Sequence, residues 1–319
     1  PISGKLTMTW EHVTLDNPNL GAQNAISGLD VLSPTWFNLM DANGGMANRA
    51  SAAYVESAHR RGYRVWGLVS NSFNAAMTTA FFKNARAMNL FMARLIIYAK
   101  LYGLDGVNID FEGMNEADRA QFVRFVARIS ELLRPEGLTL SVDVFIPANT
   151  KSSRSHDRGE LAKYVDYVML MAYDEHWRTS PRAGSVASMP WVTKAVEGTL
   201  AEGVPPSKLV LGVPFYMRRW EETKANGGVK VKGYTLTMAE AEELAAKRGA
   251  QMQWLETPGQ YYFTYVANGK VQKVWVENAA SIERKLSLVG KYGLAGMAGW
   301  RKGHEKPEVW DTISSLMGK

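Results

Sequence analysis

The sequence predicts an α/β fold, a (β/α)8 TIM barrel with a small α+β insertion between the seventh and eighth strands. Short β-branched or apolar runs alternate with longer helical patterns along all 319 residues, which is typical of βα units around a parallel sheet. We count eight strand-like runs, the number that closes a barrel of this type. The length also suits one barrel with an elaboration.

The predicted strands follow one another at regular steps. They cover residues 5–13, 31–39, 64–71, 106–112, 138–146, 165–174, 208–216 and 294–300. Between them, helices are predicted at 50–61, 82–102, 116–133, 190–202 and 281–292, each with apolar residues at three- and four-residue spacing. Four of these helices end at a glycine, the residue that most readily takes the left-handed conformation after a helix: Gly62, Gly103, Gly203 and Gly293.

One step is longer than the others. About 80 residues separate the seventh and eighth strands, against roughly 25 to 40 elsewhere. The stretch 234–249 predicts an N-capped helix, and 260–277 predicts two strands joined at Asn268 and Gly269. We therefore predict three parts: residues 1–218 with barrel strands one to seven and their helices, 219–277 as the insertion, and 278–319 with the last helices and strand eight.

The composition sets further bounds. Hydrophobic residues make up 46% and charged residues 21%, and no apolar run reaches the roughly 18 residues of a membrane span. Without cysteine, disulfides and thiolate chemistry are excluded. The net charge of +6 comes from scattered basic residues, which favours a solvated surface, with weak attraction to an anionic wall polymer as the alternative. No basic-aromatic stripe indicates nucleic acid.

Residues 104–114, LDGVNIDFEGM, are the most informative stretch. Apolar residues at positions 107, 109 and 111 alternate with Asn108, Asp110 and Glu112, so the two rows face opposite sides of a strand. In a sheet covered by helices, the polar row faces the barrel interior, where carboxylates need each other or a ligand. We interpret Asp110 and Glu112 as a catalytic pair; an unreactive hydrogen-bonded network and a polar edge strand are the alternatives.

These residues also carry a resemblance. DGVNIDFE resembles the D-G-x-D-x-D-x-E signature of glycoside hydrolase family 18, the chitinases and related N-acetylglucosaminidases. Asp105 matches its first Asp, Asp110 its third and Glu112 its Glu. Asn108 stands where the second Asp is usual, and we expect activity to survive because the acid is intact.

Other segments extend the resemblance to nearly the whole barrel. MLMAYDEHW resembles the family's sixth-strand motif, with Met171, Tyr173 and Asp174 at matching places, and AGMAGW resembles its eighth strand, ending at Trp300. The insertion resembles the family's extra α+β domain. WEHV, SPTWF, AGSVASMPW and GVPFYMRRW are closest to a bacterial subgroup that includes the spore-cortex-lytic glucosaminidases.

The resemblance implies a retaining mechanism in which the substrate's own 2-acetamido oxygen attacks the anomeric carbon. Glu112 would act as general acid and then base, and Asp110 would orient the acetamido N–H. Tyr173 would donate to the acetamido carbonyl, and Asp174 would bond the sugar or that group. Asn108, by bonding Asp110, and Asp105 would support them.

Strand ends supply the remaining candidates, because active sites of such barrels lie at the carboxyl ends of the strands. Trp300 is expected to form the floor of the sugar site, with Met171 beside it. The proposed rim residues are Trp36, Trp177, Tyr216 and Trp220, for which core packing is the alternative. Glu11 and Asp143 are expected to bond substrate hydroxyls or other protein groups, and Arg218 an anionic group or a surface carboxylate.

The sequence thus predicts hydrolysis of β-1,4 links in N-acetylglucosamine-containing glycans, with peptidoglycan favoured over chitin. The alternative is a weak or silent carbohydrate-binding barrel. No histidine pair has metal-ligand spacing, so no metal and no cofactor is expected. We expect a monomer with a carbohydrate polymer as partner and no membrane span. The chain opens at Pro1 without a leader, which we interpret as a mature or excised domain, exported to the cell wall or outside the cell, with spore association as an option.

Overall fold

The computed structural model describes residues 2–319 and contains a closed barrel. Its larger sheet has nine strands in the order β1-β14-β8-β7-β6-β5-β4-β2-β3, and β1 also pairs with β2. All neighbouring pairs are parallel except β2–β3, so eight parallel strands close the barrel and the prediction is confirmed. The strands are β1 (Leu6–Glu11), β2 (Val31–Leu39), β3 (Met46–Asn48), β4 (Arg64–Ser70), β5 (Gly106–Asp110), β6 (Thr139–Val144), β7 (Tyr167–Met171), β8 (Leu209–Pro214) and β14 (Gly296–Trp300).

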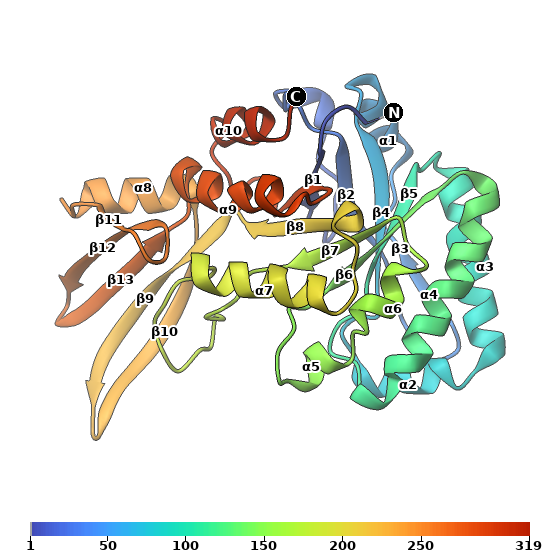
Figure 1. Cartoon of the computed structure of the whole chain (residues 1–319), viewed down its shortest axis with the longest axis horizontal. Coiled ribbons are helices and arrows are strands. Elements are labelled where there is room, and N and C mark those ends of the chain that lie inside the picture. The colour runs from blue at the N-terminus through green and yellow to red at the C-terminus, as the bar shows by residue number, and fades with distance from the viewer. Residues whose placement is uncertain (1) are drawn as a thin grey trace.

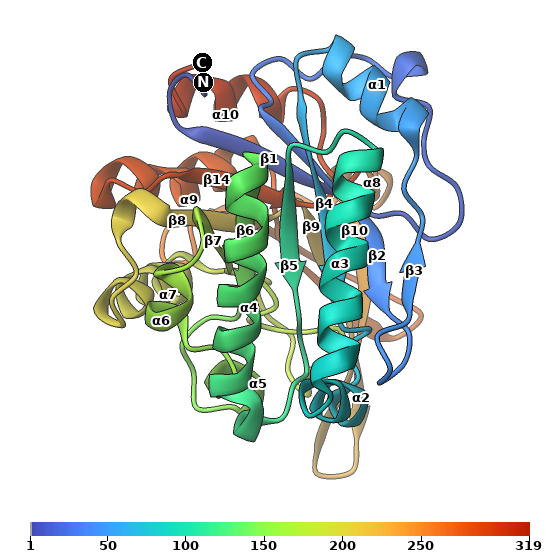
Figure 2. The ribbon, with the colours of Figure 1, turned by 90° about the vertical axis from the view of Figure 1, so that its right-hand side faces the viewer.

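Helices cover the outside of this sheet. They are α1 (Ala52–Arg60), α2 (Ala75–Phe82), α3 (Ala85–Leu101), α4 (Arg119–Leu133), α5 (Lys151–Arg154), α6 (Arg158–Ala162), α7 (Met189–Ala201), α9 (Ala279–Tyr292) and α10 (Val309–Leu316). Figure 2 shows α3 and α4 standing side by side over β5. Within residues 2–319, no helix has the length and apolar character that crossing a bilayer requires.

The helix predicted at 82–102 corresponds to α3, and α2, which precedes it, was not predicted. Asn84 caps α3, because its side chain accepts a hydrogen bond from the backbone N–H of Ala87 at 3.0 Å. Asn74 caps α2 in the same way through Met77. An Asn at an N-cap satisfies a backbone donor that the first turn leaves free, so two such residues start two helices.

The apolar row of β5 packs against these helices as predicted. Val107, Ile109 and Phe111 are fully buried, and the ring of Phe111 lies 5.3 Å from that of Phe125 on α4. The polar row therefore faces inward. The strand itself is shorter than predicted and ends at Asp110, so Glu112 lies in the loop that follows.

A second sheet stands between β8 and α9. It has the order β10-β9-β13-β12-β11, with β9 (Tyr216–Ala225), β10 (Gly228–Thr237), β11 (Gln253–Leu255), β12 (Gln260–Ala267) and β13 (Lys270–Val276), and it carries α8 (Met238–Lys247). The predicted helix begins in a capping box of Thr237 and Glu240. The hairpin at Asn268 and Gly269 joins β12 to β13.

The β9–β10 hairpin was not predicted. In Figure 1 it points downward at the lower left, beside the barrel, and in Figure 2 its tip lies at the end to which the arrowheads of β2 and β5 point. The boundaries of the insertion at 219 and 277 stay a prediction. A buried ion pair lies next to the second of them, where Lys285 of α9 contacts both oxygens of Glu277 at 2.8 and 2.9 Å.

Candidate active site

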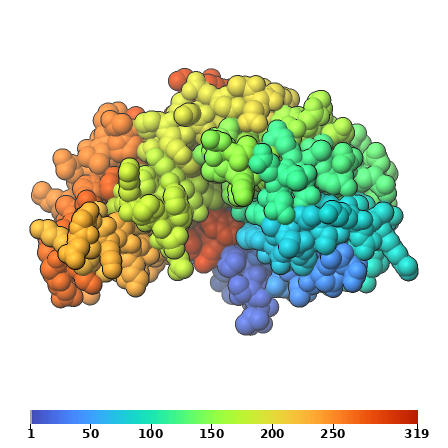
Figure 3. Space-filling model, turned by 90° about the horizontal axis from the view of Figure 1, so that it is seen from below, coloured from blue at the N-terminus to red at the C-terminus, as the bar shows by residue number. Residues whose placement is uncertain are grey.

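A pocket of about 510 Å³ opens at the carboxyl ends of the barrel strands, within the usual size range of ligand sites. Figure 3 looks onto this end, where a hollow between the blue N-terminal segment and the green segments shows red atoms at its floor. The lining includes the following predicted site residues: Asp110, Glu112, Asp143, Met171, Tyr173, Asp174, Tyr216 and Trp300.

Asp110 and Glu112 form the predicted carboxyl pair. Both line the pocket, and they lie close enough for each to affect the pKa of the other. Burial raises the pKa of Asp110 to about 6, and burial followed by the charge of Asp110 raises the pKa of Glu112 well above its usual value. One proton is therefore retained by the pair near neutral pH, as general acid catalysis requires.

Asn71 holds the loop that carries Glu112. Its side-chain oxygen accepts from the backbone N–H of Glu112 at 3.0 Å, and its Nδ2 donates to the Glu112 carbonyl at 2.9 Å. Asn71 is fully buried at the end of β4, so two opposed hydrogen bonds fix the backbone from which the acid projects.

Asn108 lies inside the barrel with partners other than those predicted. We expected it to bond Asp110, but its Nδ2 donates to Asp143 Oδ1 at 2.7 Å and to Ser141 at 2.8 Å. Its oxygen accepts from Trp10 Nε1 at 3.1 Å. The prediction was wrong because the amide is directed to the neighbouring strand β6. Asp143 is 1% exposed, and burial followed by the charge of Asp110 raises its pKa well above its usual value.

Tyr173 and Asp174 follow β7 and line the pocket. The Tyr216 hydroxyl donates to Asp174, and Arg218 Nη2 contacts the same Asp174 oxygen at 2.8 Å. Asp174 therefore has protein partners in addition to any sugar, although 45% of its side chain is exposed. Arg218 is buried and paired with Asp174. It is therefore neither part of a surface ion pair nor free to bind an anionic group of the substrate, the two roles expected from the sequence.

The aromatic candidates separate into two groups. Trp300 lines the pocket and lies 5.9 Å from the Trp10 ring, whereas the rim position predicted for Trp36 is wrong. Trp36 is fully buried, and its Nε1 donates to Asn17. Trp220 is likewise buried and donates to the Gly184 carbonyl. Trp177 is half exposed and lies outside the pocket lining.

Two acidic candidates also lie away from the pocket lining. Glu11 accepts from the Tyr54 hydroxyl at 3.1 Å and pairs with Lys302 at 3.0 Å, so its role as a substrate ligand is corrected to a buried structural one. Asp105 precedes β5 at the opposite end of the barrel, where it accepts from the backbone N–H of Val65 at 2.8 Å and pairs with His59. Asp105 therefore stabilises the start of β5 and has no direct contact with the catalytic residues at the other end of the strand.

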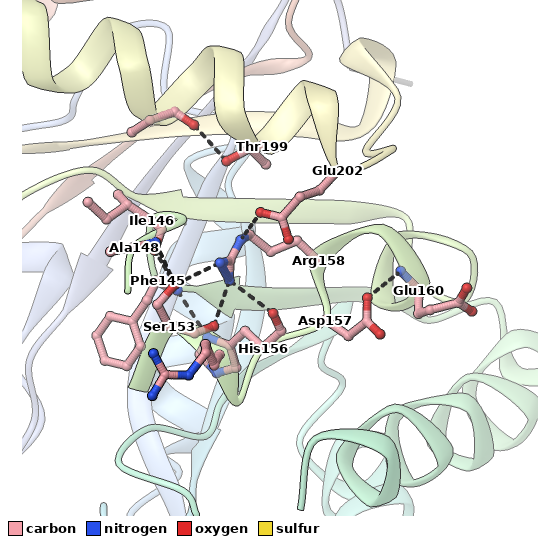
Figure 4. A network of polar contacts seen from close by, with 12 residues as sticks. Phe145, Ile146, Ala148, Ser153, His156, Asp157, Arg158, Glu160, Thr199 and Glu202 are labelled. Carbon is pink, nitrogen blue, oxygen red and sulfur yellow. Dashed lines mark hydrogen bonds and ion pairs between the residues drawn. The ribbon is translucent and has the colours of Figure 1, made fainter. Parts of the chain in front are cut away.

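His156 is fully buried behind the pocket, where it supports two segments of the site, and this role was not predicted from the sequence. Its Nε2 donates to the carbonyl of Phe111 at 2.8 Å, and its Nδ1 accepts from the N–H of Phe145 at 3.0 Å. The buried Arg158 holds the His156 carbonyl and Ser153, and pairs with Glu202 (Figure 4). Burial lowers the pKa of His156 to about 4. This neutral imidazole joins the ends of β5 and β6.

Paired carboxyls at the carboxyl end of a closed barrel, with aromatic residues beside them, define the class of barrel glycosidases. Comparison with known proteins agrees. The model of the glycosyl hydrolases family 18 matches residues 66–304, well over half of the chain. The chain belongs to this family and is a chitinase-like glycosidase, so it acts on carbohydrate.

The chain is also similar to individual members. It is 28% identical over 291 residues to the glycosylase YvbX of Bacillus subtilis, covering 86% of this chain and 80% of that protein. It is 26% identical over 252 residues to the cortical fragment-lytic enzyme of Bacillus anthracis, covering 77% of this chain but 57% of that protein. The chain thus spans little more than half the length of the second relative.

Among solved structures, the fold is similar to the spore cortex-lytic enzyme SleL of Bacillus megaterium, with a TM-score of 0.87 at 21% identity, covering 98% of this chain and 74% of that one. It is also similar to a chitinase of Chromobacterium violaceum, with a TM-score of 0.86 at 23% identity and 99% coverage of both chains.

Proposed function

We propose that this pocket cleaves β-1,4 links next to N-acetylglucosamine with retention of configuration, by assistance from the substrate's acetamido group. The closeness of Asp110 and Glu112, each of which affects the pKa of the other, supports this proposal. A protein nucleophile stands about 5 Å from its acid in ordinary retaining enzymes, with the anomeric carbon between them. Asp110 and Glu112 lie close enough to affect each other's pKa, and this closeness favours a role for Asp110 other than that of nucleophile.

The steps follow from the positions of the groups. Glu112 gives its proton to the leaving glycosidic oxygen, while the acetamido oxygen attacks the anomeric carbon. Asp110 accepts a hydrogen bond from the acetamido N–H and stabilises the cyclic cation, and Tyr173 donates a hydrogen bond to the acetamido oxygen. Glu112 then takes a proton from the water that opens the ring, which restores the acid. Trp300 provides the apolar face against which the sugar stacks.

We further propose peptidoglycan rather than chitin as the polymer. The similarity to cortical fragment-lytic enzymes and to a spore cortex-lytic enzyme supports this choice, and so does the net charge of +6, which favours an anionic polymer. An enzyme with this substrate works outside the cytoplasm, at the wall or on the spore. The similarity to a chitinase keeps chitin as the competing polymer.

Glu112→Gln tests the mechanism. The amide cannot give a proton, so kcat on an N-acetylglucosaminyl glycoside should fall by at least about 1,000-fold, within the range of general acid catalysis, while binding persists. Glu131→Gln on the exposed side of α4 is the matched control. The first-formed product should be the β-anomer by proton NMR. Retained turnover in Glu112→Gln, or an α-anomeric product, would contradict the proposal.

A second experiment decides the polymer. Purified peptidoglycan and chitin are digested side by side with equal amounts of enzyme, and the new reducing ends are identified by mass spectrometry. Faster release from peptidoglycan, with N-acetylglucosamine at the new reducing end, is expected. Faster release from chitin would replace peptidoglycan as the polymer while leaving the mechanism standing.

A further inference from the structure

Arg49 places a positive charge on one wall of the pocket, opposite the carboxyls. Arg49 and His12 line the wall built by the ends of β1, β2 and β3, whereas Asp110, Glu112 and Asp143 come from β5 and β6. The pocket therefore has a positive and a negative side, although the reaction proposed above uses only the negative side.

The guanidinium of Arg49 is held in place by neutral groups. Its Nε donates to the Thr14 carbonyl at 3.0 Å, and its Nη1 donates to Asn38 Oδ1 at 2.8 Å. Neither contact neutralises its charge, and Arg49 pairs with no carboxylate of residues 2–319. Of the five N–H donors of a guanidinium, three remain available to a ligand.

A second guanidinium lies close to this wall. Arg301 follows Trp300 directly, and its one side-chain hydrogen bond within the described chain goes to the Lys302 carbonyl at 3.4 Å. His12 lies 6.0 Å from the Trp300 ring. Burial, followed by the charges of Arg301 and Arg49, lowers the pKa of His12, so its imidazole is neutral near pH 7 and is available as a hydrogen-bonding group.

An unpaired guanidinium that faces a ligand pocket requires an explanation, because a partly buried charge without a partner is costly. A neutral glycan supplies only hydroxyls and acetamides. A glycan in which every second sugar carries a free 3-O-lactyl carboxylate, as in peptidoglycan strands whose stem peptides have been removed, supplies one anion per disaccharide. An arginine fork matches a carboxylate with two parallel hydrogen bonds.

We propose that Arg49, with Arg301 and His12 beside it, forms a subsite for the carboxylate of a lactyl-bearing sugar next to the N-acetylglucosamine that is cleaved. The proposal rests on the function proposed for the same pocket. This subsite would also fix the register of the glycan in the pocket, since the sugar with the carboxylate is repelled by Asp110 and Asp143 and attracted to Arg49. The acetamido sugar without a lactyl group thus occupies the carboxyl side.

The test compares two glycans that differ only in charge. Peptide-free strands with free lactyl carboxylates are compared with the same strands after conversion of these groups to methylamides. We expect wild type to show at least a tenfold higher kcat/KM on the charged strands. Arg49→Gln should reduce this ratio about tenfold, and raised ionic strength should reduce it in wild type but not in the variant.

Controls separate charge from fold. Arg128→Gln, a similar change on the outer face of α4, should keep the wild-type ratio, and Arg49→Lys, which keeps the charge without the fork, should fall between wild type and Arg49→Gln. A ratio that is unchanged in Arg49→Gln overturns the subsite. An Arg49 effect that appears only with strands bearing stem peptides overturns the lactyl group as its ligand.

Failure of the subsite and failure of the function give different results. If wild type cleaves neither strand, the proposed function fails, and calorimetric binding of both strands to Glu112→Gln then tests the subsite without turnover. Tighter, salt-sensitive binding of the charged strands that Arg49→Gln abolishes supports it. Equal binding of both strands, or binding of neither, overturns it.

Discussion

Replacing Asn108 by Asp is expected to move the pH profile of kcat/KM upward by about one pH unit. Asn108 is fully buried, and its amide donates to Asp143 at 2.7 Å. This donor favours the ionised form of Asp143. A carboxyl in its place removes the donor and adds a further ionisable group beside Asp110. Both changes disfavour negative charge in the site, so the pKa values of the carboxyls rise together.

The magnitude follows from the strand geometry. Side chains at i and i+2 of a strand are about 7 Å apart, and two charges at that distance repel by roughly 2.4 kcal/mol at an effective dielectric constant of about 20. This corresponds to about 1.7 pKa units. Sharing of a proton between the introduced carboxyl and Asp143 reduces the shift to about one unit.

The same substitution links stability to pH. The introduced carboxyl has a raised pKa in the folded state, so the folded protein keeps a proton that the unfolded chain releases above about pH 4. The free energy of unfolding of Asn108→Asp relative to wild type should therefore fall as the pH rises above about 4, by about 1.4 kcal/mol per unit until the folded-state pKa is reached.

Initial rates on an N-acetylglucosaminyl aryl glycoside between about pH 4 and 9 measure the shift across the range in which the carboxyls titrate. Asn89→Asp, which adds the same charge on the exposed face of α3, controls for net charge. Superimposable profiles of wild type and Asn108→Asp would refute the reasoning that the amide sets the ionisation of the carboxyl cluster.

Three further changes test other parts of the structure. Tyr173→Phe should lower kcat about 100-fold, since it removes a donor to the developing charge, and should change KM less than about threefold; a loss confined to KM would argue against this. His156 stays neutral down to about pH 4 in the folded protein but protonates near pH 6.5 in the unfolded chain, so the free energy of unfolding decreases as the pH is lowered through this window. Between about pH 6.5 and 4, His156→Gln should therefore lose about 3 kcal/mol less of its free energy of unfolding than wild type, as measured by urea unfolding. Lys285→Ala should lower the free energy of unfolding by about 4 kcal/mol because Glu277 is left charged and buried, while Lys291→Ala on the exposed side of α9 should cost under about 0.5 kcal/mol; equal effects would contradict a structural role for the pair.

The barrel was predictable because each strand repeats the same local signals. Alternating or apolar runs occur eight times, with five helical patterns among them, and the parallel pairing confirms all eight strands. Strand ends were less predictable, since β5 stops at Asp110 rather than at 112. The β9–β10 hairpin was missed because its turn at Asn226 and Gly227 lies in a polar, lysine-rich stretch without an apolar face.

For the site residues on or just after β5, β7 and β14, the position in the strand was enough to predict that they line the pocket. The hydrogen-bond partners of the side chains could not be predicted in this way. Glu11 ends β1 as expected, but a lysine and a tyrosine from distant segments take up its carboxylate. His156 carries no motif, and only the folded loop brings its ring between Phe111 and Phe145. Such contacts depend on loop paths that no local pattern encodes.

Trp36 shows why position at a strand end is insufficient to assign a residue to a site. Neighbouring residues of a strand face opposite sides of a sheet, and β2 is irregular between Thr35 and Phe37. Thr35 lines the pocket while Trp36 packs edge-on against Tyr54 of α1, 5.2 Å between ring centres. A shift of one residue thus decides between a sugar-stacking and a core tryptophan. Trp300, at the end of a regularly paired strand, faces the pocket, so register rather than residue type made the difference.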